Sequence, residues 1–92
     1  MLTVKHHNLL VEGKIYGRVR IFEDGRSVTS FDGHDPTGEA DESDTAIACF
    51  EHASEVLEKL GFVGHPVTIE SDFADAGYAI LCGEEGVEGA EA

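Results

Sequence analysis

The feature that most constrains the fold is a single helical stripe of apolar residues in the middle of the chain. At about 100° per residue, the apolar side chains between residues 44 and 60 fall on one side of a helix: Ala46, Cys49, Phe50, Ala53, Val56, Leu57 and Leu60. Ser43 or Asp44 is suited to cap its start, and Gly61, followed by Phe62, is placed to end it. An amphipathic helix of this kind must bury its stripe against other elements, and the sequence around it offers a sheet.

Alternation of apolar and polar residues predicts strands on both sides of this helix. The predicted strands lie at Leu2–Val11, 14–22, 27–31, 66–70 and 77–82. Asp24 and Gly25 favour a two-residue hairpin turn between the second and third strands, and this turn would place Ile21 opposite Val28. The segment 71–76 is predicted to be a loop.

The predicted fold is therefore an α+β domain, in which an antiparallel sheet of about five strands is covered on one face by one amphipathic helix. The order is three strands, the helix and two strands. Residues 1–82 are predicted to form the compact domain, and the Glu-rich and Gly-rich segment 83–92 is predicted to be a flexible acidic tail. On the uncovered face, Tyr16, Phe22 and Phe31 are candidates for contact with a partner.

The charge balance excludes several classes of function. The chain carries 19 Asp and Glu against 6 Lys and Arg, a net charge of −13. Affinity for phosphate comes from cations, so we expect neither direct nucleic-acid binding nor attraction to an anionic membrane. No stretch is apolar enough for a membrane span or a secretory signal, and two cysteines, Cys49 and Cys82, are too few for a disulfide framework. These features predict reduced thiols and a cytoplasmic location.

The acids are concentrated in one part of the chain. Residues 1–31 hold five cations and three acids, whereas residues 32–92 hold sixteen acids and one cation, Lys59. Four acids of the helix fall within about 60° of each other, opposite the apolar stripe; we call this group, Asp44, Glu51, Glu55 and Glu58, the acidic ridge. Like charges three or four residues apart cost a helix roughly a few tenths of a kcal/mol each. The acidic ridge is therefore predicted to serve binding, although solubility alone or adaptation to high salt would also account for it.

No pattern of residues predicts a catalytic or metal centre. Cys49 and His52 are three residues apart on the helix, but the paired Cys-x-x-Cys elements typical of zinc sites are absent from the sequence. Cys49 lies in the most acidic part of the chain, which disfavours a reactive thiolate. We therefore expect no cofactor, no metal and no enzymatic activity. A metal-assisted enzyme around Cys49, His52 and Asp35 is a third-ranked alternative.

The concentration of acids in one part of the chain and the lack of a catalytic motif are features in which the chain resembles the small acidic proteins that phages use against bacterial defence, especially anti-CRISPR proteins. Many of these proteins are single α+β domains of this size that mimic nucleic acid electrostatically. The residues that carry the resemblance are Asp41, Glu42, Asp44, Glu51, Glu55 and Glu58. The resemblance implies a non-enzymatic inhibitor in the host bacterial cytoplasm that binds a CRISPR effector, a basic nucleic-acid-binding protein, through these residues and blocks its nucleic-acid site.

The outer face of the predicted hairpin is basic and differs from a uniform nucleic-acid mimic. Tyr16, Arg18, Arg20 and Phe22 on that face form a predicted secondary contact, either with an acidic patch of the partner or with RNA bound to it. The alternative function is a small binding or assembly module, monomeric or homodimeric through the exposed sheet face, whose acids serve only solubility.

Overall fold

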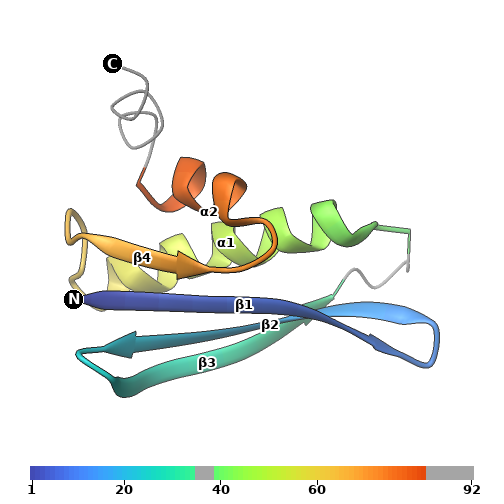
Figure 1. The fold of residues 1–92 in the computed structure, drawn as a ribbon, viewed down its shortest axis with the longest axis horizontal. Coiled ribbons are helices and arrows are strands. Elements are labelled where there is room, and N and C mark those ends of the chain that lie inside the picture. The colour runs from blue at the N-terminus through green and yellow to red at the C-terminus, as the bar shows by residue number, and fades with distance from the viewer. Residues whose placement is uncertain (35–38, 83–92) are drawn as a thin grey trace.

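The computed structural model describes residues 1–34 and 39–82, which form four strands and two helices. In chain order these are β1 (Leu2–Val11), β2 (Lys14–Glu23), β3 (Arg26–His34), α1 (Glu42–Lys59), β4 (Val67–Glu70) and α2 (Ala74–Leu81). The strands form one sheet in the order β3-β2-β1-β4, with β4 parallel to β1 and the other neighbours antiparallel (Figure 1). Both helices lie on one face of the sheet, so the prediction of an α+β fold is confirmed (Figure 1).

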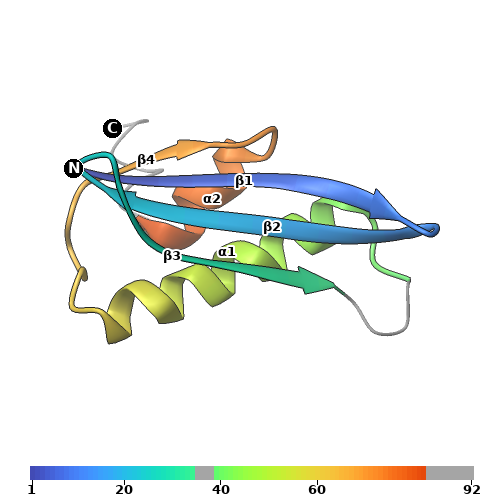
Figure 2. The ribbon, with the colours of Figure 1, turned by 90° about the horizontal axis from the view of Figure 1, so that it is seen from below.

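Side chains that alternate along the strands meet the apolar stripe of α1 to form the core. Figure 2 shows the opposite face of the sheet, which neither helix covers. The largest fully buried side chains are those of the helix residue Phe50 and of four strand residues, Leu2, Val4, Val19 and Ile21. The inward positions of β1 and β2 are thus mostly apolar, with the buried His6 as an exception, and their outward positions carry charged, polar and aromatic residues.

The hairpin between β2 and β3 differs in register from the prediction. Asp24 and Gly25 do form its turn, with φ values of 52° and 83°, as a turn of this type requires. Ile21 nevertheless pairs with Thr29 and not with Val28, because a β-bulge interrupts the ladder between Ile21 and Phe22. One inserted residue reverses the faces of all those that follow it in the strand.

This bulge explains why the predicted position of Phe31 is wrong. Phe31 pairs with Val19 and packs on the helix side, where its ring meets the His52 ring edge-on at 4.6 Å between centroids. Tyr16 and Phe22, by contrast, lie on the uncovered face, as predicted. β3 also extends to His34, beyond the predicted end at residue 31.

Both ends of α1 are fixed by local hydrogen bonds. The N-cap is Asp41, not Ser43 or Asp44, and its Oδ1 accepts the Asp44 backbone N–H at 2.8 Å. At the other end the Phe62 N–H donates to the Leu57 carbonyl at 2.9 Å across Gly61, whose φ is 86°. This is the Schellman arrangement that the glycine and the following apolar residue predicted.

The predicted fifth strand is wrong, since most of residues 77–82 belong to α2. A short apolar run fits a strand and a buried helix equally well. In the structure this run is helical, and its Gly77 packs against the core, where a Cβ would lie 2.9 Å from Phe50 Cζ and 3.0 Å from Ile69 Cδ1. The predicted all-antiparallel sheet is also wrong, because α1 carries the chain back across the sheet and β4 then runs parallel to β1. The predicted tail, 83–92, lies outside the described residues.

α1 packs directly on the sheet backbone at Gly17, so we expect Gly17→Ala to destabilise the fold. An added Cβ would overlap Cys49 Sγ and come within 3.2 Å of Thr45 Cγ2. Overpacking of this kind costs about 1 to 3 kcal/mol, which urea unfolding would measure.

Two further variants make this test specific. Cys49→Ala in the Gly17→Ala background should recover part of the loss. Gly33→Ala, whose Cβ would lie 3.8 Å from the same sulfur, should change stability much less. Equal stability of Gly17→Ala and the wild type would show that α1 is not held at this distance from the sheet.

Candidate functional site

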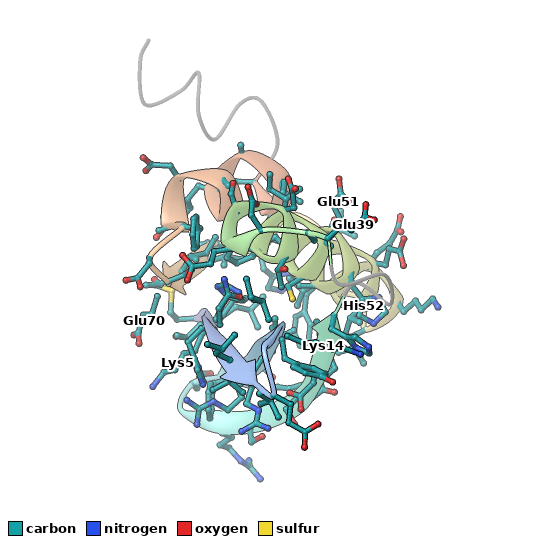
Figure 3. All side chains as sticks on the ribbon, turned by 90° about the vertical axis from the view of Figure 1, so that its right-hand side faces the viewer. Lys5, Lys14, Glu39, Glu51, His52 and Glu70 are labelled. Atoms are coloured by element: carbon teal, nitrogen blue, oxygen red, sulfur yellow. The ribbon has the colours of Figure 1, made fainter. Side chains whose placement is uncertain are left out.

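The acidic ridge lies on the solvent side of α1. All four of its carboxylates, those of Asp44, Glu51, Glu55 and Glu58, are exposed. Figure 3, which looks along the helix, shows Glu51 on the helix side of the molecule and Lys5 and Lys14 on the sheet side. The fold therefore keeps these carboxylates accessible instead of covering them with another element.

Few charges compensate the acidic ridge. His52 Nδ1 lies 3.7 Å from Glu55 Oε1, three residues away, and both side chains are more than half exposed. Among the described residues no ion pair joins a ridge carboxylate to a lysine or an arginine. The ridge thus presents a row of same-sign charge to solvent.

The other two acids of the predicted site lie apart from the acidic ridge. Asp41 caps the helix, so one of its carboxylate oxygens already accepts the Asp44 N–H. Glu42 is exposed, but it is two residues from Asp44, which places it about 200° around the helix. Its backbone carbonyl accepts a hydrogen bond from Asn8 Nδ2 at 3.0 Å. The structure thus brings together four of the six predicted residues on one side of α1.

The predicted secondary contact, Tyr16, Arg18, Arg20 and Phe22, occupies alternate positions of β2 on the uncovered face of the sheet. The Arg18 guanidinium donates to both carboxylate oxygens of Asp32, at 2.9 and 3.1 Å. This hydrogen bonding holds the pKa of Asp32 below its usual value. The side chains of this face therefore form an ordered surface between neighbouring strands.

Aromatic rings on the same face pair with cationic or titratable neighbours. The Tyr16 and His34 rings lie 4.6 Å apart between centroids, across β2 and β3. Lys5 Nζ lies 5.2 Å from the centroid of the Phe22 ring, within the range of a cation–π interaction.

The uncovered face carries a charge opposite to that of α1. Its charged residues are the cations Lys5, Lys14, Arg18 and Arg20 and the acids Asp32 and Glu70; we call this surface the basic sheet face. The two acids lie close to cations of the same face, Asp32 to Arg18 and Glu70 to Lys5 at 3.8 Å. The described part of the chain is thus two-sided, with carboxylates on the helix and cations on the sheet (Figure 3).

A cavity that sequence reasoning missed lies between α1 and β3. It has a volume of about 410 Å³ and a largely apolar lining that includes Phe31, Gly33, Ala48, Cys49 and His52. Its signal in the sequence was a pair of glycines, Gly17 and Gly33, which oppose each other in the β2–β3 ladder. Without side chains at these positions the sheet surface is hollow beneath the helix, and Cys49 Sγ lies over both glycines.

Cys49 is unsuited to act as a nucleophile. Its thiol is buried, and burial, with a smaller contribution from the Asp32 carboxylate, raises its pKa above the usual value. Within residues 1–34 and 39–82 no three His, Cys, Asp or Glu side chains are grouped closely enough to hold a metal ion. The predicted third-ranked site includes Asp35, which is not among these residues.

Comparison of the chain with protein-family models, with curated proteins and with solved structures found no match to any of them. In the described part of the chain neither helix combines the length and apolar character needed to cross a membrane. The residues and their geometry are therefore the basis for assigning a function.

His6 and Cys49 are the two titratable side chains that are buried in the described structure. His6 is 4% exposed, and its ring packs against Phe50 at 5.1 Å between centroids. Nε2 donates to Asn8 Oδ1 at 3.0 Å, and Nδ1 accepts from the Ser71 hydroxyl at 2.8 Å, an assignment that follows from the partners. Ser71 Oγ also accepts the Phe73 N–H at 2.9 Å, so every polar atom of this network is satisfied.

We expect His6 to make the fold less stable at mildly acidic pH. Burial lowers the pKa of His6, so as the pH falls the unfolded chain takes up this proton before the folded chain does. His6 therefore contributes most above about pH 6.5, and its contribution falls as the pH drops through that value, levelling off below the lowered pKa.

Urea unfolding at about pH 7.5 and about pH 5.5 tests this, with His6→Gln compared with the wild type. The wild type should lose more unfolding free energy over this interval than the variant does. His7→Gln, at the exposed neighbouring position, is the control and should behave like the wild type. An identical loss in His6→Gln and the wild type would rule out this role.

Proposed function

We propose that this chain is a non-enzymatic inhibitor that binds a basic nucleic-acid-binding protein through the acidic ridge and blocks that protein's nucleic-acid site. The observation that carries the proposal is the exposed row of Asp44, Glu51, Glu55 and Glu58, which lacks lysine or arginine partners among the described residues. Residues four apart on a helix are about 6 Å apart along its axis, a spacing similar to that of neighbouring phosphates on a strand.

The charges of the acidic ridge favour association with a partner more than they favour the stability of the fold. Like charges at the spacings of Glu51, Glu55 and Glu58 oppose helix formation, and of the four ridge acids only Asp44, in the first turn, gains from the helix dipole. Across an interface the same charges steer a cationic partner and select against anionic ones. Four of the six lysines and arginines lie on the basic sheet face. Lys59, although it is in the last turn of α1, forms no ion pair with a ridge carboxylate in the described structure, so the field of the acidic ridge is largely uncompensated.

The buried reactive side chains support the non-enzymatic part of the proposal. Cys49 contacts the glycines beneath α1, and His6 is held in a saturated hydrogen-bond network. Each therefore has a packing role that accounts for its position. A CRISPR effector is the target class that we propose, since its channel for the guide–target duplex is strongly positive.

A second candidate function, an assembly module, is favoured by the two-sided charge. An acidic side and a basic side on one molecule allow copies to associate head to tail, an arrangement that does not close by itself. Such assembly would occur without another protein and would weaken as salt is added.

Charge reversal tests the inhibitor proposal. We expect Glu51→Lys, Glu55→Lys and Glu58→Lys together to weaken the inhibition of target-DNA binding by purified guide-loaded CRISPR effectors, by about tenfold or more in the half-maximal concentration. Anisotropy of labelled target DNA measures this, at two salt concentrations. The wild type should inhibit in a one-to-one ratio and less well at high salt.

The control makes the same change in charge elsewhere. Glu12→Lys, Glu23→Lys and Asp72→Lys alter exposed acids away from α1, and this variant should inhibit as the wild type does. Equal inhibition by the two triple variants would contradict the proposal. Salt-sensitive self-association of the wild type alone, seen by light scattering, together with no inhibition of any effector, would favour the assembly module instead.

A further inference from the structure

The two edge strands of the sheet, β4 and β3, differ in whether their outer backbone groups have a hydrogen-bond partner. At the β4 edge the Tyr78 hydroxyl accepts the Ile69 backbone N–H at 3.0 Å, so α2 supplies a partner to that strand. At the other edge β3 pairs only with β2 in the sheet that the described residues form. Alternate residues of β3 therefore direct backbone N–H and C=O groups away from the sheet.

One half of β3 is regular, and of the features that commonly protect an edge strand it carries only one charged residue, Asp32, which is paired with Arg18 of β2. The bulge lies at its start, opposite Ile21 and Phe22, and the strand pairs regularly from Ser30 to His34. β3 contains neither proline nor lysine, the residues that commonly prevent strand addition. The regular half is thus able to pair with a further strand.

The apolar cavity lies beside this same half. Phe31 and Gly33 line it from β3, and Ala48 and His52 line it from α1. Its volume, about 410 Å³, is in the range of sites that hold a ligand group. A strand added to β3 would place one of its inward side chains at this opening.

One carboxylate of the acidic ridge lies at the cavity. Asp44 lines it from α1, whereas Asp32, which borders it from β3, has its carboxylate paired with Arg18 on the uncovered face. His52, also in the lining, contacts Glu55. We call the edge from Ser30 to His34 together with this cavity the β3 groove.

We propose that the β3 groove binds an extended cationic peptide segment of the partner, which adds to β3 as a strand and inserts one apolar side chain into the cavity. Arginine or lysine two residues before and after that side chain would share its face and lie beside the acidic ridge. This inference rests on the proposed function, because it states how the basic partner is held.

Charge distinguishes this occupant from the others that the chain itself offers. The segment 83–92 contains four glutamates and no cation, so Asp44 and the rest of the acidic ridge would repel it. A second copy pairing through its own β3 would bring only Arg26 as a cation. A cationic segment of another protein complements the charge of this site better than either.

The probe for this proposal is a capped heptapeptide, Thr-Arg-Thr-Leu-Thr-Arg-Thr, whose leucine and arginines share one face of a strand. Its control has the same composition but the order Thr-Thr-Arg-Leu-Arg-Thr-Thr, which moves both arginines to the opposite face. We expect the probe to bind the full chain more tightly than the control and to slow amide exchange in the Ser30–His34 half of β3.

Two substitutions fill the cavity from opposite sides. Gly33→Val suits a strand, and its Cβ would lie 3.8 Å from Cys49 Sγ, an ordinary contact. Ala48→Phe fills the cavity from the exposed side of α1. Each should weaken probe binding about tenfold or more, whereas Thr68→Val, at an exposed position on β4 at the other edge of the sheet, should leave it unchanged. Urea unfolding confirms that all three variants fold.

Several results would overturn the β3 groove as the binding site: no binding of the probe, equal binding to Gly33→Val and the wild type, or probe-induced shifts on the basic sheet face. Concentration-dependent protection of β3 without peptide would assign the edge to a second copy instead. If ridge reversal abolishes effector inhibition while Gly33→Val and Ala48→Phe leave it intact, the proposed function stands and the groove proposal fails.

Discussion

The close contact of α1 with the sheet over Gly17 is the constraint on which the rest of the structure depends. Because Gly17 has no side chain, Cys49 packs on the β2 backbone, and the apolar stripe reaches the core from Ala46 to Leu57. Leu60, a predicted member of the stripe, is exposed. The contact at Gly17 fixes the rotation of the helix about its axis. The same rotation turns the acidic ridge to solvent and leaves the cavity next to Gly33, so packing and the candidate site have one origin.

The separation of charge follows from the same arrangement. One helix face and one sheet face bury each other, and the two outer sides are free to differ in composition. In this chain they differ in sign, because most cations are in the segment of the first three strands and most acids follow it. The acidic ridge and the β3 groove are adjacent through Asp44, so a single extended cationic partner segment would contact both.

How much the sequence could predict depended on the range of the interactions. The end of α1 at Gly61 and the exposed position of Glu51 follow from neighbours within a turn or two, and both predictions agree with the structure. The face of Phe31 depended on a bulge, and the short apolar run 77–81 fits a strand and a helix equally well when its tertiary contacts, such as that of Gly77 with the core, are unknown. Alternation and hydropathy carry no information on such distant contacts, which is also why the cavity was missed.

Carboxylate footprinting directly tests whether the acidic ridge contacts the effector. Carbodiimide labelling of exposed Asp and Glu, read by mass spectrometry, compares the free chain with the chain bound to a guide-loaded effector. Binding through the acidic ridge requires protection of Asp44, Glu51, Glu55 and Glu58, while Glu12 and Glu23 at the hairpin turns should label as in the free chain. Unchanged labelling of the acidic ridge in a stable complex, with protection at the turns or on the basic sheet face, would contradict it.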